Sequence, residues 1–324
     1  MHLIAGSKTE LGHKNGNSFY ARFGDITGMV TSPDDPKSLW IADYTNNCFR
    51  ILNRQTKQVQ DLTGNCGDTA VHDDNFEFAG VGDPIGLVSW DRDRVYFYDN
   101  AKPRIRCLYR LNKVWYILTT YRSTSQVHNF AGNVESGYFY LLRDEEIQRV
   151  SLDRTVSENI IDPHEEYDDG LLSRAGIKKP VHMIFLEPEV LLIADQGYHN
   201  LRVINLETSK ISSVCLPQES DTSLVTVFGP INNCKLEYPT FIFKDGVNKV
   251  IRVLGYIQSY TLRYEITTET ASSATEALPF PEEEEAPNRR VLSTAEIFGV
   301  AILFLLAVFG MVLAMLIYNG ASTQ

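Results

Sequence analysis

The chain has 324 residues and a formal net charge of −11, from 41 Asp and Glu residues against 30 Lys and Arg residues. A protein that neutralises phosphates needs a basic face, and the sequence holds no dense cluster of Lys and Arg, which excludes nucleic acid as the expected partner. It also lacks a Gly-x-Ser-x-Gly motif, a phosphate-binding loop and a Cys-x-x-Cys pair, so no familiar catalytic motif points to an enzyme.

The first repeat unit of the chain predicts four short strands separated by turns. Their expected ranges are 26–31, 39–43, 48–52 and 59–63. The runs are rich in β-branched and aromatic residues and are split by Asp, Asn, Gly and Pro, which is typical of strands joined by tight turns. The second strand ends at Asp43, and Arg50 follows seven residues later on the third strand.

The same order of strand, Asp and Arg recurs along residues 1–266. The repeated pairs, again seven residues apart, are Asp99 with Arg106 and Asp195 with Arg202. A degenerate copy ends at Tyr256 and a shorter variant at Asp144. Four strands in a repeat of about 50 residues indicate the blades of a β-propeller; a two-sheet sandwich is the alternative, but it would not repeat the spacing. We interpret the pairs as scaffold, because a carboxylate that accepts turn N–H groups and pairs with a guanidinium would fix each hairpin.

The first unit resembles an NHL repeat. Its segments GHKNGNSFYARF (12–23), LWIAD (39–43), NCFR (47–50) and DLTG (61–64) are similar to that family's D/N-G, A-R-F, A-D, N-x-x-R and T-L-A-G positions. The resemblance covers 1–266, implies a propeller of four-stranded blades and says almost nothing about activity. Five units are visible, so we favour five blades, although NHL propellers usually have six. Residues 2–6 look like the family's closing strand, and we expect them to complete the last blade and close the ring.

Two disulfides are predicted from the positions of the cysteines. Cys48 and Cys66 are equidistant from a turn near residue 56, so they face each other across an antiparallel pair. Cys215 and Cys234 flank a loop between blades and are the second candidate pair. Cys107 lies inside a strand and should be a buried free thiol. Two bridges would imply an oxidising compartment; the alternative is five reduced cysteines in the cytosol.

His128 and His182 are the histidines that could carry chemistry. Both stand near the start of a strand expected to line the channel, where two imidazoles could hold a metal. Among related propellers, peptidyl-glycine amidating lyases bind zinc through three histidines at such positions. Here Thr27 and Phe241 occupy the equivalent positions, and a catalytic zinc needs about three protein ligands. We therefore expect no catalytic residue and no cofactor. The alternatives are zinc bound by His128 and His182, or calcium bound by the acidic loop 164–169.

The C-terminal part of the sequence predicts a membrane anchor. Residues 267–296 are rich in Thr, Ser, Pro and Glu and are expected to be a disordered acidic stalk. The uncharged run from Ile297 to Tyr318 would form about 33 Å of helix, enough to cross a hydrocarbon core of roughly 30 Å. A buried core helix is the alternative, but such helices seldom lack a polar face. A short tail, 319–324, follows.

The sequence gives conflicting indications of the side of the membrane on which the propeller domain lies. The N-terminus has no apolar secretory segment, and Arg289 and Arg290 precede a span whose tail carries no charged side chain, which would place the domain in the cytosol as a tail-anchored protein. The two predicted disulfides favour a lumenal or extracellular domain, and we favour that side. Within the span, Gly310 and Ala314 would allow a weak homodimer.

The function expected from these features is non-catalytic binding. A propeller presents its inter-strand loops on one face, and the loops 66–82 and 162–180 vary most in length. We therefore expect a membrane-anchored scaffold that binds a protein, peptide or glycan. The alternatives are a metal-dependent lyase or hydrolase with its site in the channel, and a purely structural surface protein.

Overall fold

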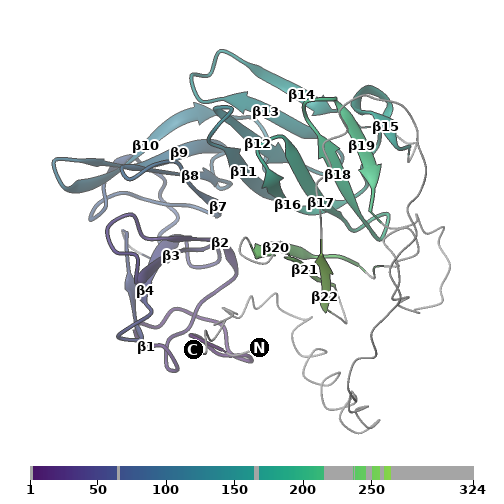
Figure 1. Ribbon diagram of the computed structural model, residues 1–324. Coiled ribbons are helices and arrows are strands. Elements are labelled where there is room, and N and C mark those ends of the chain that lie inside the picture. The colour runs from purple at the N-terminus through teal and green to yellow at the C-terminus, as the bar shows by residue number, and fades with distance from the viewer. Residues whose placement is uncertain are drawn as a thin grey trace, which may run out of the picture.

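The computed structural model describes residues 3–63, 66–163, 168–214, 236, 238–245, 250–255 and 259–263. Apart from one short 3-10 turn (Leu172–Arg174), the regular structure of these residues is antiparallel β-sheet, which confirms the predicted all-β class. The strands form five sheets arranged around a common axis, and consecutive long strands are neighbours within each sheet (Figure 1). This is the arrangement of propeller blades.

The first two blades have five strands each. The first consists of β1 (Gly16–Asn17), β2 (Ile26–Thr31), β3 (Ser38–Asp43), β4 (Cys48–Asn53) and β5 (Gln58–Asp61), in the order β1-β5-β4-β3-β2. The second consists of β6 (Asp74–Asn75), β7 (Pro84–Ser89), β8 (Arg94–Asp99), β9 (Arg104–Leu111) and β10 (Val114–Arg122), in the equivalent order. In both blades the two-residue strand pairs with the last strand and so covers an otherwise open sheet edge.

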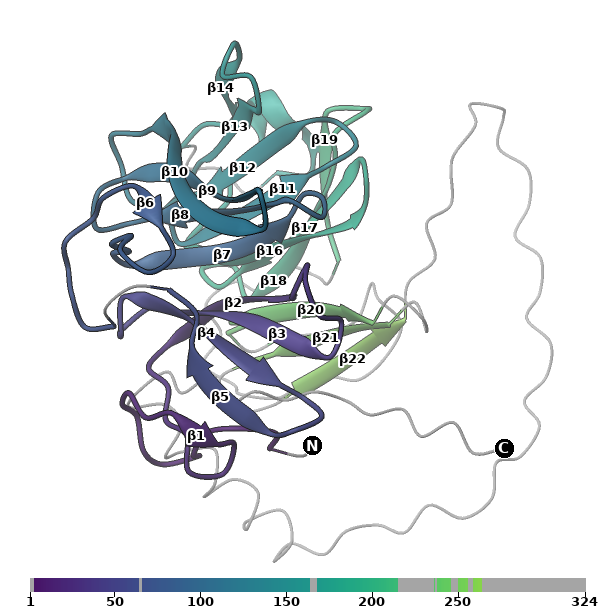
Figure 2. The same ribbon diagram turned by 90° about the vertical axis from the view of Figure 1, so that its left-hand side faces the viewer.

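The remaining blades continue the ring. The third consists of β11 (Asn129–Asn133), β12 (Tyr138–Leu142), β13 (Ile147–Ser151) and β14 (Ser157–Ile161). The fourth consists of β15 (Gly170–Leu171), β16 (Pro180–Glu187), β17 (Val190–Asp195), β18 (Asn200–Asn205) and β19 (Lys210–Ser213), and the fifth of β20 (Phe241–Asp245), β21 (Val250–Leu254) and β22 (Ser259–Arg263). The innermost strands β2, β7, β11, β16 and β20 contact one another in this order. Both views place β20 beside β2, where the ring returns to its start (Figures 1 and 2).

Apolar side chains fill the spaces between neighbouring blades. Between the first and second blades, Trp40 packs edge-on against Trp115 and Phe49 against Phe97, both with ring centroids 4.8 Å apart. The contact between the second and third blades is similarly aromatic. Both faces of the first blade are covered, one by the second blade and the other by the N-terminal segment, so every residue of β3 is buried. Burial of this apolar surface is the main stabilising term of the fold.

The N-terminal segment packs against the first blade. Ala5 is buried in the same cluster as Phe23 and Ile26, and the Gly6 N–H donates to the Ser18 carbonyl at 2.8 Å. The pairing predicted between residues 2–6 and the last blade is not among the strand pairings of the described residues, so it stays a prediction.

The four strands predicted for the first blade are all present. The range predicted for β2 has the observed bounds, whereas the fourth strand, predicted at 59–63, is Gln58–Asp61. Asp61, which lies opposite Arg50 on β4, is the last residue of β5 to pair in this ladder. The stalk 267–296, the span 297–318 and the tail 319–324 lie outside the described residues. Among the residues that are described, no helix is long and apolar enough to cross a membrane.

Candidate functional site

The repeated arginines are fully buried inside the blades. Arg50 Nη1 donates to Asp43 Oδ2 at 3.0 Å, and Arg106 Nη1 donates to Asp99 Oδ2 at 2.9 Å. In each case the second terminal nitrogen reaches the segment that forms the outer edge of the blade. The acceptors of these second bonds are Asn15 Oδ1 at 2.6 Å and Asp73 Oδ1 at 3.0 Å. One guanidinium therefore joins the middle of a blade to its outer strand.

The fourth blade repeats this arrangement with different partners. Arg202 donates to Asp169 Oδ1 at 3.2 Å and to the Gly176 carbonyl at 3.2 Å. Asp195, also buried, accepts the backbone N–H groups of Lys178 at 2.9 Å and Tyr198 at 3.3 Å. The repeated Asp thus holds the segment that enters the innermost strand, as well as the turn predicted from the sequence. All these contacts lie within single blades.

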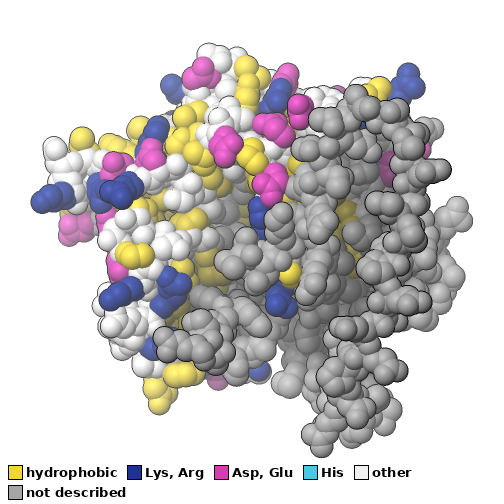
Figure 3. All heavy atoms as spheres, in the orientation of Figure 1, with side chains coloured by type: hydrophobic (Ala, Val, Ile, Leu, Met, Phe, Trp, Pro, Cys, Tyr) yellow, Lys and Arg dark blue, Asp and Glu magenta, His cyan; other side chains and the backbone are white. Residues whose placement is uncertain are grey.

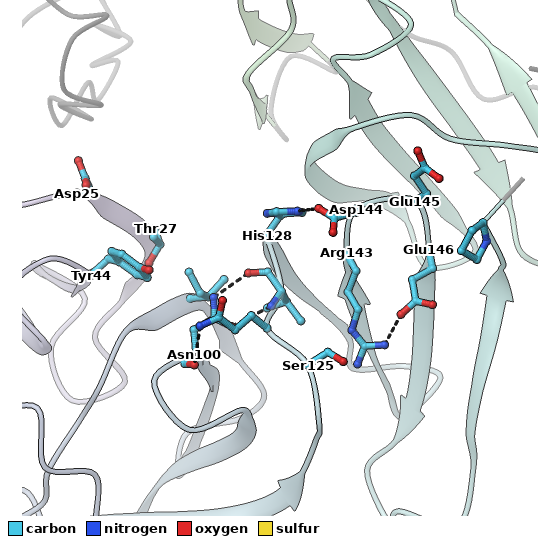
Figure 4. A pocket seen from close by; sticks show the side chains of 14 residues that line it. Asp25, Thr27, Tyr44, Asn100, Ser125, His128, Arg143, Asp144, Glu145 and Glu146 are labelled. Carbon is cyan, nitrogen blue, oxygen red and sulfur yellow. Dashed lines mark hydrogen bonds and ion pairs between the residues drawn. The ribbon is translucent and has the colours of Figure 1, made fainter. Parts of the chain in front are cut away.

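A cavity of about 700 Å³ lies where the innermost strands of the first three blades begin. Residues of all three blades line it, and Figure 4 shows them converging on one space. The lining includes Asp25, Thr27 and Tyr44 of the first blade, Ile85 and Asn100 of the second, and residues 125–128 and 143–146 of the third. This volume lies within the usual range of ligand pockets.

The charged groups of the cavity come mainly from one turn. The turn between β12 and β13 supplies Arg143, Asp144, Glu145 and Glu146. Arg143 pairs with Glu146 and also donates to Gln148 Oε1 at 2.8 Å. With Asp25 the cavity has four carboxylates against one guanidinium, which is a formal charge of −3 when His128 is neutral. Acidic side chains also lie near the middle of the face in Figure 3.

The remaining polar groups are held by one contact within the third blade and one between the second and third blades. His128 Nε2 lies 2.6 Å from Asp144 Oδ1. The Asn100 side chain donates to the Val127 carbonyl at 2.8 Å and accepts the Val127 N–H at 2.9 Å, so it fixes the segment before β11. Burial, together with the charges of Asp83 and Asp25, raises the pKa of Tyr44, whose phenol therefore stays protonated.

His128 and His182, paired in the sequence argument, have different surroundings. His128 lines the cavity with a half-exposed side chain, whereas His182 is buried and does not line it. Burial lowers the pKa of His182 to about 3, its Nδ1 has no hydrogen-bond partner among the described residues, and its ring lies 4.0 Å from that of Phe241. Thr27 donates to the Pro84 carbonyl at 2.5 Å. Within the described residues, neither histidine belongs to a group of three metal-ligating side chains.

The cysteine predictions have three outcomes. The Cys48–Cys66 disulfide is present and its Cα atoms are 5.0 Å apart, which confirms that prediction. Cys107 is a buried free thiol, as predicted, and burial raises its pKa to about 12. Cys215 and Cys234 lie outside the described residues, as do residues 164–167 of the acidic loop.

Most residues of the cavity are not predicted from the sequence. The repeat identifies Asp144 only as a marker position and gives no role to the charged run that Asp144 begins with Glu145. That run of three acidic residues in the turn after a buried strand is the one signal in the sequence that indicates the site. Asn100 and Tyr44 carry no such signal, because their role depends on contacts with another blade.

No protein-family model and no curated protein sequence matches the chain. Among solved structures, a chain of a nidogen–laminin complex is similar to it, with 12% sequence identity, a TM-score of 0.50 and coverage of 74% of this chain and 75% of that chain. An auxiliary nutrient binding protein from Bacteroides ovatus (16% identity, TM-score 0.47, 78% and 73% covered) and virginiamycin B lyase from Staphylococcus aureus (13%, 0.43, 74% and 70%) also match. At this identity the likeness shows the fold alone, and the class of protein is a β-propeller with several blades.

Proposed function

We propose that the chain is a membrane-anchored propeller that binds, without catalysis, a protein or peptide partner presenting a Lys or Arg side chain to the cavity. The ring has five blades, residues 2–6 complete the last one, and 297–318 crosses the bilayer. One observation carries the binding proposal. The cavity has four carboxylates against one guanidinium, and that guanidinium is already paired with Glu146.

The geometry of the cavity supports a cationic side chain as the ligand. A volume of about 700 Å³ is large enough for such a side chain together with some of its backbone. Tyr44 and Ile85 supply surface for the aliphatic stem, and the carboxylates of Asp25, Asp144 and Glu145 supply acceptors for the charged end. The Asp144 side chain is 92% exposed, so it can turn to a ligand without breaking a buried contact.

The disulfide supports a lumenal or extracellular position for the propeller. Disulfides persist in oxidising compartments and are rare in the cytosol, and Cys48–Cys66 is formed. Mass spectrometry of the chain from cells, alkylated before and after reduction, tests this position. Free Cys48 and Cys66 in the chain isolated from cells would contradict an oxidising compartment. Resistance of the full chain to alkaline extraction from membranes, lost on deletion of 297–318, tests the anchor.

Peptide binding by the full chain in detergent tests the function. The probes are a lysine-rich, a glutamate-rich and a neutral peptide of equal length. We expect the lysine-rich peptide to bind best and the variant Asp144→Asn/Glu145→Gln to weaken it by roughly tenfold, from the loss of two exposed charge pairs. Glu207→Gln, in the exposed turn after β18, is the matched control. Equal binding of all three peptides, or zinc bound through His128, would reject this function in favour of the glycan-binding or metal-enzyme alternative.

A further inference from the structure

A second group of polar side chains lies in the first blade, away from the cavity. The ligand atoms of His13, Cys48, Asp61 and Cys66 all lie within 4.8 Å of one another. Cys48 begins β4, Asp61 ends β5, His13 lies before β1 and Cys66 lies after β5. Four separate parts of the chain thus bring a histidine, a carboxylate and two sulfurs to one place, which is more than a disulfide requires.

The position of His13 is fixed on both sides. The carbonyl of Gly12 accepts a hydrogen bond from Asn46 Nδ2 at 3.0 Å, and that of Lys14 accepts one from Arg50 Nη2 at 3.2 Å. The imidazole Nε2 itself lies 2.8 Å from Asp61 Oδ1. The backbone on either side of the ring is therefore anchored to the blade, and the ring is directed at Asp61 and the two sulfurs.

A histidine, a carboxylate and two cysteine sulfurs are the kinds of group that bind zinc in tetrahedral sites. Zinc binds sulfur at about 2.3 Å and nitrogen or oxygen at about 2.0–2.2 Å, so its ligand atoms lie roughly 3.3–3.8 Å apart. The separations reach 4.8 Å, so the most distant groups must approach by about 1 Å. The two sulfurs, once their bond is broken, and the His13–Asp61 pair at 2.8 Å must instead move apart to these distances. While the sulfurs are bonded to each other they cannot act as thiolate ligands, so the oxidised protein lacks half of the site.

The charges around the group suit a bound zinc ion. Zinc with two thiolates and one carboxylate has a net charge of −1. Arg50 Nε lies 2.7 Å from Asp61 Oδ1 and offsets this charge.

We propose that reduction of the Cys48–Cys66 disulfide converts this group into a zinc site in which His13 and Asp61 are the other two ligands. A dithiol reductant gives two electrons and two protons to the disulfide, which becomes two thiols, and the reductant itself becomes a disulfide. Zinc then displaces one proton from each thiol. Both the disulfide and the ion join β4 to the segment after β5, so this corner of the blade stays closed in either redox state. The site is separate from the binding function proposed above.

Cobalt binding by the full chain in detergent tests the proposal, since Co²⁺ replaces zinc and its thiolate complexes absorb light. The oxidised protein, and protein reduced with dithiothreitol and desalted without oxygen, are titrated with Co²⁺. We expect one equivalent with thiolate-to-cobalt and tetrahedral bands in the reduced protein and none in the oxidised protein. His13→Ala and Asp61→Asn keep the disulfide and should each weaken reduced-state binding at least about tenfold. His72→Ala, an exposed histidine on the corresponding segment of the second blade, should change nothing.

Three results would overturn the proposal. The first is the lack of tetrahedral bands in the reduced wild-type protein. The second is bands of undiminished strength in both His13→Ala and Asp61→Asn, with circular dichroism of the same samples to show whether the β-structure is kept. The third is bands that survive in Cys48→Ser/Cys66→Ser, which would assign the metal to other cysteines of the chain.

Discussion

Three buried arginines, Arg50, Arg106 and Arg202, occupy equivalent places in three blades and connect the same two parts of each blade. Their planar guanidinium groups reach an inner acceptor and an outer one at once. A lysine, with a single point charge, cannot make both contacts. The repeated arginine is therefore explained by the attachment of the short outer strand to its blade, without any ligand.

Arg106→Leu should lower the free energy of unfolding by about 3–5 kcal/mol, because it leaves the buried Asp99 carboxylate without its ion pair. Arg94→Leu is the matched control in the same blade. Arg94 pairs with Asp91, both side chains are about 40% exposed, and such pairs contribute at most about 1 kcal/mol. Guanidinium chloride unfolding of the three proteins measures both losses. Equal losses of unfolding free energy in the two variants would show that the buried ion pair stabilises the fold no more than the exposed one.

Asp195 should make stability depend on pH between about 4 and 6. Burial raises its pKa from 3.8 to about 6, although backbone hydrogen bonds from Lys178 and Tyr198 and the charge of Arg202 lower it. The folded state then holds the proton more tightly than the unfolded state, so this contribution to stability is complete below about pH 4 and is lost as pH rises through about 6. A shift of about two units corresponds to about 3 kcal/mol. We expect Asp195→Asn to lose less stability than wild type across this window in urea unfolding, and parallel profiles would contradict the assignment.

At the scale of strands, β2 and β7 of neighbouring blades approach each other closely. A Cβ added at Gly28 would lie 2.6 Å from backbone atoms of Gly86 and Leu87. Gly28→Ala should therefore separate the two strands and cost roughly 1–3 kcal/mol. In Gly137→Ala the new methyl group meets nothing within 4 Å, and only the φ of 76° opposes it, at about 1 kcal/mol. Thermal unfolding compares the two, and a smaller loss in Gly28→Ala would show that the blades adjust without strain.

The strands were predictable because each blade is encoded locally. The Asp that ends β3 and the Asn residues that precede β4 lie within a few residues of one another, and the repeat shows such a turn several times. The cavity was not predictable in this way, since its lining residues, from Asp25 to Pro163, lie up to about 140 residues apart and converge only when three blades pack together. Equivalent positions in the repeat also do not guarantee equivalent surroundings. His182 starts its strand much as His128 does, but Phe241 of the fifth blade covers it.

At the scale of the whole molecule, the net charge of −11 creates a field that reaches beyond the cavity. A negatively charged cleft raises the local concentration of cations and speeds their association, and salt screens this effect. The Debye length falls from about 30 Å at 0.01 M salt to about 10 Å at 0.1 M. Both the cavity and the rest of the surface act over such distances, so the proposed partner should be attracted before it makes any contact.

The association rate of the lysine-rich peptide should therefore fall steeply with salt, while its dissociation rate changes little, because steering acts on the encounter and short-range contacts hold the complex. Stopped-flow fluorescence measures both rates between 0.01 and 0.5 M salt, where the Debye length falls from roughly 30 Å (weak screening) to under 5 Å (strong screening). In Asp144→Asn/Glu145→Gln the slope of the association rate against salt should flatten, since two charges at the mouth of the cavity are gone. Glu207→Gln should keep the wild-type slope. A slope that Glu207→Gln flattens as much as the double variant does would mean that the whole surface, and not the cavity, attracts the peptide.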